Sequence, residues 1–76
     1  MIRRLSFDHA PEELASRRSG TTEVALLWSK RAHRAAVAVE DSVEGTRFEL
    51  LVDPGDNALD LFEHPYFYAA RRGIAA

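Results

Sequence analysis

The chain has 76 residues, of which 46% are hydrophobic and 29% are charged, a balance typical of a single globular domain. Its formal net charge of −2 at pH 7 is too close to neutral to indicate a nucleic-acid or membrane partner. The absence of cysteine excludes disulfides, thiol catalysis and iron–sulfur or zinc-ribbon sites, and no apolar run approaches the roughly 20 residues of a membrane span. We therefore expect a small cytoplasmic protein with no export signal.

Residues 1–20 have the weakest periodicity in the chain. Pro11-Glu12-Glu13 could open a short helix that continues to Arg18, with Leu14 on its apolar side, and a helix of that length is marginal unless it docks on something larger. These features predict an N-terminal segment with a short helix, residues 1–20, ahead of a globular domain formed by residues 21–76.

Alternating apolar residues predict three strands, at residues 23–29, 34–40 and 46–52. The connections between them are short, which is typical of an antiparallel meander. The larger apolar side chains share one face of this sheet: Val24, Leu26, Trp28, Val37, Val39, Phe48, Leu50 and Val52. That face needs a covering layer.

The covering layer is predicted to be a C-terminal helix over residues 53–73. Asp53 is a plausible N-cap, Pro54 suits the first helical position, and Gly73 is a typical stop. Pro65 removes a backbone donor, so we expect a kink there or two short helices that meet. The predicted inward stripe is Leu59, Phe62, Tyr66 and Ala69 or Ala70. The predicted class is α+β, in the order helix–strand–strand–strand–helix.

That element order resembles the order in double-stranded RNA-binding domains. The last helix of that family opens with a lysine-rich motif, whereas this chain has Asp53-Pro54-Gly55-Asp56, whose carboxylates would repel phosphate. A second resemblance spans roughly residues 22–73, and its motifs are Leu27-Trp28-Ser29, Ala58-Leu59-Asp60, His64-Pro65-Tyr66 and Tyr68-Ala69-Ala70. These motifs resemble a group of small uncharacterised proteins of high-GC actinobacteria, and that resemblance implies no activity.

The first predicted turn is basic, and its candidate nucleic-acid-binding residues are Lys30, Arg31 and Arg34. In a meander the end of the third strand returns to this turn, which would bring Asp53 and Asp56 beside it. The helix would then carry Arg71 and Arg72 toward the acidic turn, residues 41–45. Because each cluster would meet opposite charge, the field that phosphate binding requires is weakened, and nucleic-acid binding is the lesser alternative.

Signals of catalysis are weak. His9, His33 and His64 lie in three separate elements, and none has a recognisable ligand spacing. Asp60 and His64 are four residues apart and could hold a metal or form an acid–base pair, but a surface ion pair is the favoured interpretation because metal sites normally need three or four ligands. We expect no catalytic residue, no metal, no cofactor and no small-molecule substrate.

The second face of the predicted sheet has a small apolar centre with a charged rim, which is how a protein interface often looks. We call this centre the Ala-lined face: Ala25, Leu27, Ala36, Ala38 and Leu51. Three occupants are open: the N-terminal segment, through Ile2, Leu5, Phe7 and Leu14; a second copy, which would give a homodimer; or another protein.

Tyr66, Phe67 and Tyr68 are consecutive, so they cannot all face the core of a helical packing. We expect Tyr66 to pack inward and Tyr68 to keep its hydroxyl in water, where it could anchor a partner. Together with the Ala-lined face, this predicts a small protein-interaction or regulatory module rather than an enzyme.

Overall fold

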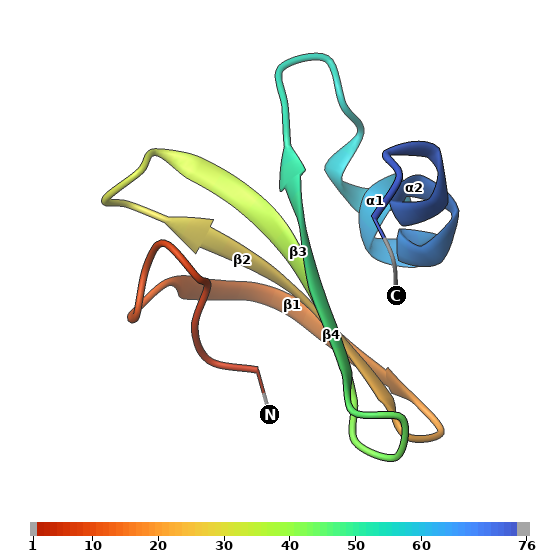
Figure 1. Ribbon diagram of the computed structural model, residues 1–76. Helices are drawn as coiled ribbons and strands as arrows, with labels where there is room; N and C mark the ends of the chain where they lie inside the picture. The colour runs from red at the N-terminus through yellow and green to blue at the C-terminus, as the bar shows by residue number, and fades with distance from the viewer. Residues whose placement is uncertain (1, 75–76) are drawn as a thin grey trace.

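The computed structural model describes residues 2–74, and residues 1, 75 and 76 lie outside the described part. Within that part the chain forms one antiparallel sheet of four strands in sequential order, followed by two short helices. The elements are β1 (Glu12–Ser19), β2 (Thr22–Ser29), β3 (Arg34–Asp41), β4 (Thr46–Val52), α1 (Ala58–Glu63) and α2 (Pro65–Arg71). Figure 1 shows the helices on one side of the sheet and the N-terminal stretch on the other.

The first strand replaces the predicted N-terminal helix, and that prediction was wrong. β1 pairs antiparallel with β2 through the two-residue turn Gly20-Thr21. Gly20 has a φ of 62° whereas Thr21 is outside the left-handed region, an arrangement that fits the type II′ turn favoured in two-residue hairpins. Pairing with the edge of β2 satisfies the backbone more completely than a marginal helix with two apolar side chains would. The sheet therefore has four strands rather than three, and β1 pairs with the first of the predicted strands.

The three predicted strands are confirmed as β2, β3 and β4, each within one residue of its expected bounds. Their register aligns the large apolar residues in rows across the sheet, for example Leu26 beside Val37 and Val37 beside Leu50. That face packs against the helices in a buried cluster: Val24, Leu26, Val37, Val39, Phe48, Leu50, Leu61, Phe62 and Ala69. The predicted contact between this face of the sheet and the C-terminal helical layer is thus confirmed.

The helical layer begins later than predicted. Residues 53–56 form a turn in which the backbone N–H of Asp56 donates to the carbonyl oxygen of Asp53 at 2.9 Å. Asn57 is the N-cap instead, and its side-chain oxygen accepts from the backbone N–H of Asp60 at 3.1 Å. The predicted break at Pro65 is confirmed, because Pro65 starts α2 and holds His64 out of the helical region (φ −130°, ψ 54°).

The break changes which side chains face the sheet. Leu61, Phe62, Pro65 and Ala69 are buried, whereas Leu59 and Tyr66 are exposed, so part of the predicted inward stripe was wrong. A single period does not continue through a proline junction, since the second helix starts with a new axis.

The second helix runs back toward the place where the first began. The Arg72 guanidinium contacts the carboxylate of Asp56 at 2.9 Å and the carbonyl oxygen of Leu51 at 2.7 Å. The prediction that Arg71 and Arg72 reach the acidic turn was therefore wrong, because the break at Pro65 reverses the chain. Gly73 ends α2 as predicted, with a φ of 73°. No helix in residues 2–74 is long and apolar enough to cross a membrane.

Candidate protein-interaction surfaces

The Ala-lined face is covered by the chain itself. We call residues 2–8 the covering segment. Ile2 and Leu5 are buried against the sheet, and Phe7 is half-buried at its margin. Of the three occupants considered from sequence, the N-terminal segment is therefore the one that covers this face. The side chains of the covering segment pack on Ala25, Leu27, Ala36 and Ala38, with Leu51 half-buried beside them. Leu14, also predicted to contribute, is 52% exposed on β1.

The charged rim of the Ala-lined face fastens the covering segment. The carboxylate of Glu49 accepts hydrogen bonds from the backbone N–H of Ser6 at 2.9 Å and from its hydroxyl at 2.8 Å. The guanidinium of Arg47 donates to the carbonyl oxygen of Arg4 at 2.9 Å. Two residues of the rim that suggested an interface with another protein, Arg47 and Glu49, therefore bind residues of the same chain, and a partner could reach the apolar centre only after these contacts break.

A buried hydrogen bond closes the covering segment at its far end. The hydroxyl of Ser29 donates to the carboxylate of Asp8 at 2.5 Å and accepts from the backbone N–H of Ala32 at 3.0 Å. Both side chains are buried, and the backbone N–H of Ala10 also donates to Asp8. The Ser29 hydrogen bond, followed by that of Ala10, lowers the pKa of Asp8 below its usual value. Asp8 thus remains a carboxylate that ties the segment to the ends of β2 and its turn.

The aromatic run at the start of α2 is oriented differently from the prediction. Tyr68 is half-buried against the core, and its hydroxyl donates to the carboxylate of Asp60. This bond, together with burial, raises the pKa of Tyr68. Tyr66 is 44% exposed and Phe67 is 56% exposed, so these two residues, rather than Tyr68, present aromatic surface to solvent.

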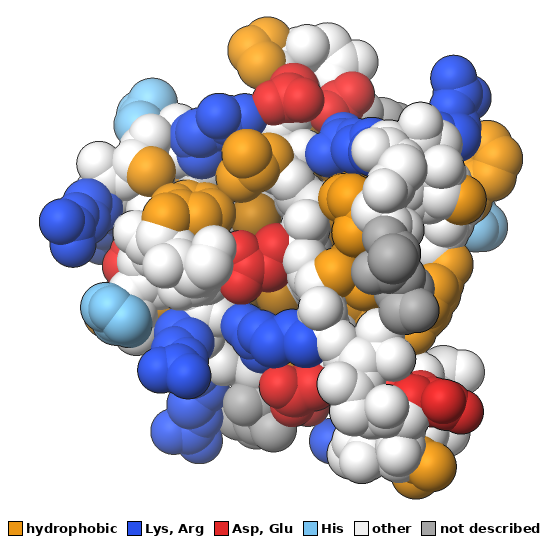
Figure 2. Space-filling model, in the orientation of Figure 1, with side chains coloured by type: hydrophobic (Ala, Val, Ile, Leu, Met, Phe, Trp, Pro, Cys, Tyr) orange, Lys and Arg blue, Asp and Glu red, His pale blue; other side chains and the backbone are white. Residues whose placement is uncertain are grey.

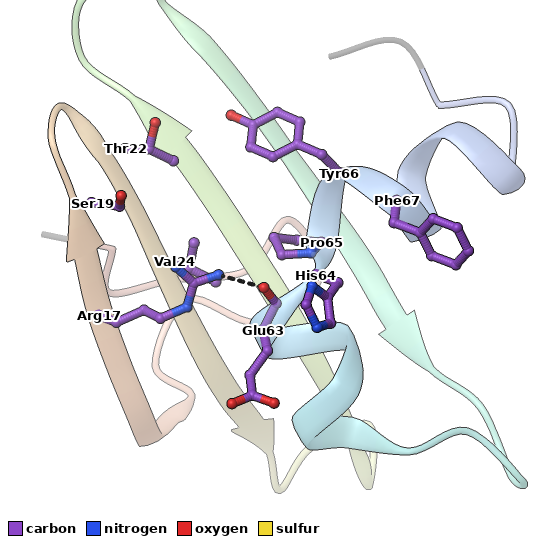
Figure 3. A pocket seen from close by; sticks show the side chains of 9 residues that line it. All are labelled: Arg17, Ser19, Thr22, Val24, Glu63, His64, Pro65, Tyr66 and Phe67. Carbon is purple, nitrogen blue, oxygen red and sulfur yellow. Dashed lines mark hydrogen bonds between the residues drawn. The ribbon is translucent and has the colours of Figure 1, made fainter.

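An open groove lies beside these rings, between the sheet and the junction of the helices (Figure 3). We call it the aromatic groove. Its volume is about 360 Å³, and its lining residues are Arg17, Ser19, Thr22, Val24, Glu63, His64, Pro65, Tyr66 and Phe67. Tyr66 leans over the strands, whereas Phe67 points outward from the helix and forms part of the rim.

Arg17 joins the two walls of the aromatic groove. Its guanidinium donates to the carbonyl oxygens of Phe62 at 2.9 Å and Glu63 at 3.1 Å, and it lies 5.4 Å from the centroid of the Phe62 ring. These carbonyls are free because α1 ends there, so Arg17 caps the helix. Sequence reasoning missed this residue, since β1 was predicted as a helix and no motif surrounds Arg17.

The basic turn between β2 and β3 has one of its two expected acidic neighbours, Asp53, whereas Asp56 pairs with Arg72. Arg34 forms an ion pair with Asp53, which confirms that the end of β4 returns to this turn. Lys30 and Arg31 are exposed, and the ring of His33 meets that of Trp28 edge-on at 5.1 Å. Figure 2 shows basic and acidic side chains interspersed over the visible face of the molecule.

Asp60 and His64 do not form the surface ion pair that was favoured from sequence, because the Asp60 carboxylate binds another side chain. The carboxylate of Asp60 accepts a hydrogen bond from the hydroxyl of Tyr68, and the backbone N–H of His64 donates to the carbonyl oxygen of Asp60 at 2.9 Å. Among residues 2–74, no three His, Cys, Asp or Glu side chains are grouped as metal ligands would be.

The chain was compared with protein-family models, curated proteins and solved structures, and none of them matches it.

Proposed function

We propose that this chain is a small protein-interaction module that binds a partner protein in the aromatic groove, acts in the cytoplasm and has no catalytic activity of its own. The observation that supports the proposal most strongly is the exposure of Tyr66 and Phe67 beside an open groove. Exposed aromatic side chains cost free energy in water, and at interfaces they supply much of the binding energy.

The walls of the groove favour an extended ligand. The exposed rings of Tyr66 and Phe67 provide apolar surface, while the hydroxyls of Ser19 and Thr22 lie along the strand side. Arg17 already bonds to helix carbonyls, so a ligand is not needed to satisfy it. An apolar side chain can therefore occupy the groove while the ligand backbone follows the sheet, which is a common way to bind an extended peptide.

A library of random 12-residue peptides displayed on phage tests the proposal. Selection on the wild-type chain should enrich peptides whose affinity drops at least about tenfold in Tyr66→Ser or Phe67→Ser, because truncating a central aromatic contact commonly costs more than about 1.4 kcal/mol. Leu59→Ser is the matched control, since Leu59 is an exposed apolar residue on α1 outside the groove lining. Enriched peptides that bind both groove variants as well as the wild type would reject the groove as the site.

Nucleic-acid binding through Lys30, Arg31 and Arg34 is the weaker alternative. Lys30 and Arg31 are exposed, which favours it, but Arg34 is engaged by Asp53. Oligonucleotide affinity that falls steeply with added salt and weakens in Lys30→Glu would support this alternative over the groove.

A further inference from the structure

We propose that β1 is the docking edge for the partner, which adds an extended acidic segment as a fifth strand along residues 15–19 while an apolar side chain enters the aromatic groove. The inference rests on the proposed function and names its binding mode and ligand chemistry. Strand addition to a free sheet edge is an established route of peptide recognition, in which backbone hydrogen bonds provide affinity and side-chain pockets provide specificity.

The outer edge of β1 has no strand partner within residues 2–74, because the sheet order places β1 at the margin. The two-residue turn makes Ser19 and Thr22 a hydrogen-bonded pair, and such pairs alternate along an antiparallel ladder. Arg17 and Val24 are then the next hydrogen-bonded pair. The backbone groups of Ser16 and Arg18 therefore point away from β2, where an added strand can bind them.

The opposite edge of the sheet is less accessible. The carbonyl oxygen of Leu51 in β4 already accepts a hydrogen bond from Arg72, which follows α2. Both helices contact β4, whereas β1 contributes Arg17 and Ser19 to the open groove. A groove also lies beside β4, but Ser6 and Phe7 of the covering segment form part of its lining, whereas no residue of that segment lines the aromatic groove beside β1.

The usable edge is short. The pairing of β1 with β2 shifts register between Glu13 and Ala15, so Leu14 forms a bulge that interrupts the ladder. Residues 15–19 are the regular part. Beyond the bulge, Glu12 and Glu13 would repel an acidic strand, which limits the docked segment to the side next to the groove.

The charges on this regular part indicate what kind of strand fits. Arg17 and Arg18 are consecutive, so their side chains lie on opposite faces of the sheet. The side chain of Arg18 is 59% exposed, and one nitrogen of its guanidinium lies 3.4 Å from a carboxylate oxygen of Glu23. The exposed remainder of the guanidinium leaves room for a second carboxylate. In a symmetric pairing of two copies about residues 15–19, Arg17 would face Arg17, and like charges directly opposite are destabilising. An acidic partner strand is therefore favoured over a second copy of this chain.

A capped nine-residue peptide that alternates Val and Asp is the first probe. In an added strand its Asp side chains can lie on the face of Arg18 while its Val side chains lie on the groove face. Two N-methylated forms are the decisive comparison, one methylated at the Val amides and the other at the Asp amides. Only one alternating set of amides faces β1, so one form should bind at least about tenfold more weakly than the parent and the other within about threefold.

Charge reversal tests the ligand chemistry on the full chain. Arg18→Glu should weaken the Asp peptide about tenfold and favour a peptide with Lys in place of Asp. Lys30→Glu is the matched control, because it changes net charge equally at an exposed turn outside β1. Peptide binding that both variants lower equally would reflect net charge alone and would overturn the edge assignment.

The outcomes separate this inference from the proposed function. If neither N-methylated form differs from the parent, or if both lose binding equally, strand addition is wrong, even where phage-selected peptides still depend on Tyr66 and Phe67. No binding of the Val and Asp peptide would also overturn the acidic-strand assignment. If sedimentation shows that the chain dimerises and Arg18→Glu alters that dimer, the edge pairs two copies instead, and the proposal is likewise overturned.

Discussion

Leu5→Ala is the sharpest test of whether the covering segment is docked on the sheet. Leu5 is 1% exposed and packs on the Ala-lined face. The substitution removes three carbon groups at about 0.8 kcal/mol each, or about 2.4 kcal/mol in transfer free energy. A residual cavity adds to this, but a terminal segment can close over it, so we expect a total near the lower end of the usual range of about 2–5 kcal/mol.

That loss is large for a domain of this size. A stability of about 0.05–0.15 kcal/mol per residue gives about 4–11 kcal/mol for the whole chain. Urea denaturation followed by the fluorescence of Trp28, the only tryptophan, should show a lower midpoint at an unchanged slope. An unchanged slope matters because it shows that the same surface is exposed on unfolding.

Leu14→Ala is the matched control, since Leu14 is 52% exposed and should change stability by no more than about 0.5 kcal/mol. If the two alanine variants have the same midpoint, the reasoning fails: residues 2–8 then contribute nothing to the folded state, and the Ala-lined face is open to another occupant.

Two further perturbations test the polar contacts. Arg17→Ala should cost about 1–2 kcal/mol in unfolding free energy because two carbonyl oxygens at the end of α1 lose their donor, whereas Arg18→Ala should cost about 0–1 kcal/mol as a largely exposed ion pair. Equal costs in urea denaturation would contradict the capping role. The lowered pKa of Asp8 means that its carboxylate stabilises the fold above the unfolded value of about 3.9, and that this contribution is lost as the pH falls through the folded pKa. Ser29→Ala should therefore narrow the difference between urea midpoints measured at about pH 6 and about pH 3, and an unaltered difference would show that the hydrogen bond from Ser29 does not perturb Asp8.

Alternating hydrophobicity was enough to predict β2, β3 and β4. All three strands are covered on the helix side, where their larger apolar residues recur with the period of the strand. β2 and β3 are buried on the other side as well, so further apolar residues lie between the large ones and make a nearly continuous apolar run. Gly73 and Pro65 were equally informative, because their backbone restrictions act locally. The break at Pro65 was predictable for that reason, whereas the direction that α2 takes after it was not.

β1 had no such pattern. It is an edge strand with both faces largely open to water, so its side chains are polar on both sides and its sequence reads as a weak helix. The informative signal was Gly20 in a two-residue connection, which specifies a hairpin without any apolar alternation. Arg17 and the edge on which it lies became recognisable as part of a candidate site only once β1 was placed beside α1.

The Ala-lined face shows most clearly which features could be predicted from local sequence and which depended on the tertiary structure. Its alternating small residues and charged rim established that something covers it, because an apolar centre of that kind is unfavourable in water. These features did not identify the segment or partner that covers it. Ile2, Leu5 and Phe7 have no period that marks them as a layer, and their burial depends on contacts more than 20 residues distant in sequence, such as that between Asp8 and Ser29. Only the folded chain brings these groups together, since the free energy that holds them comes from contacts that no local segment contains.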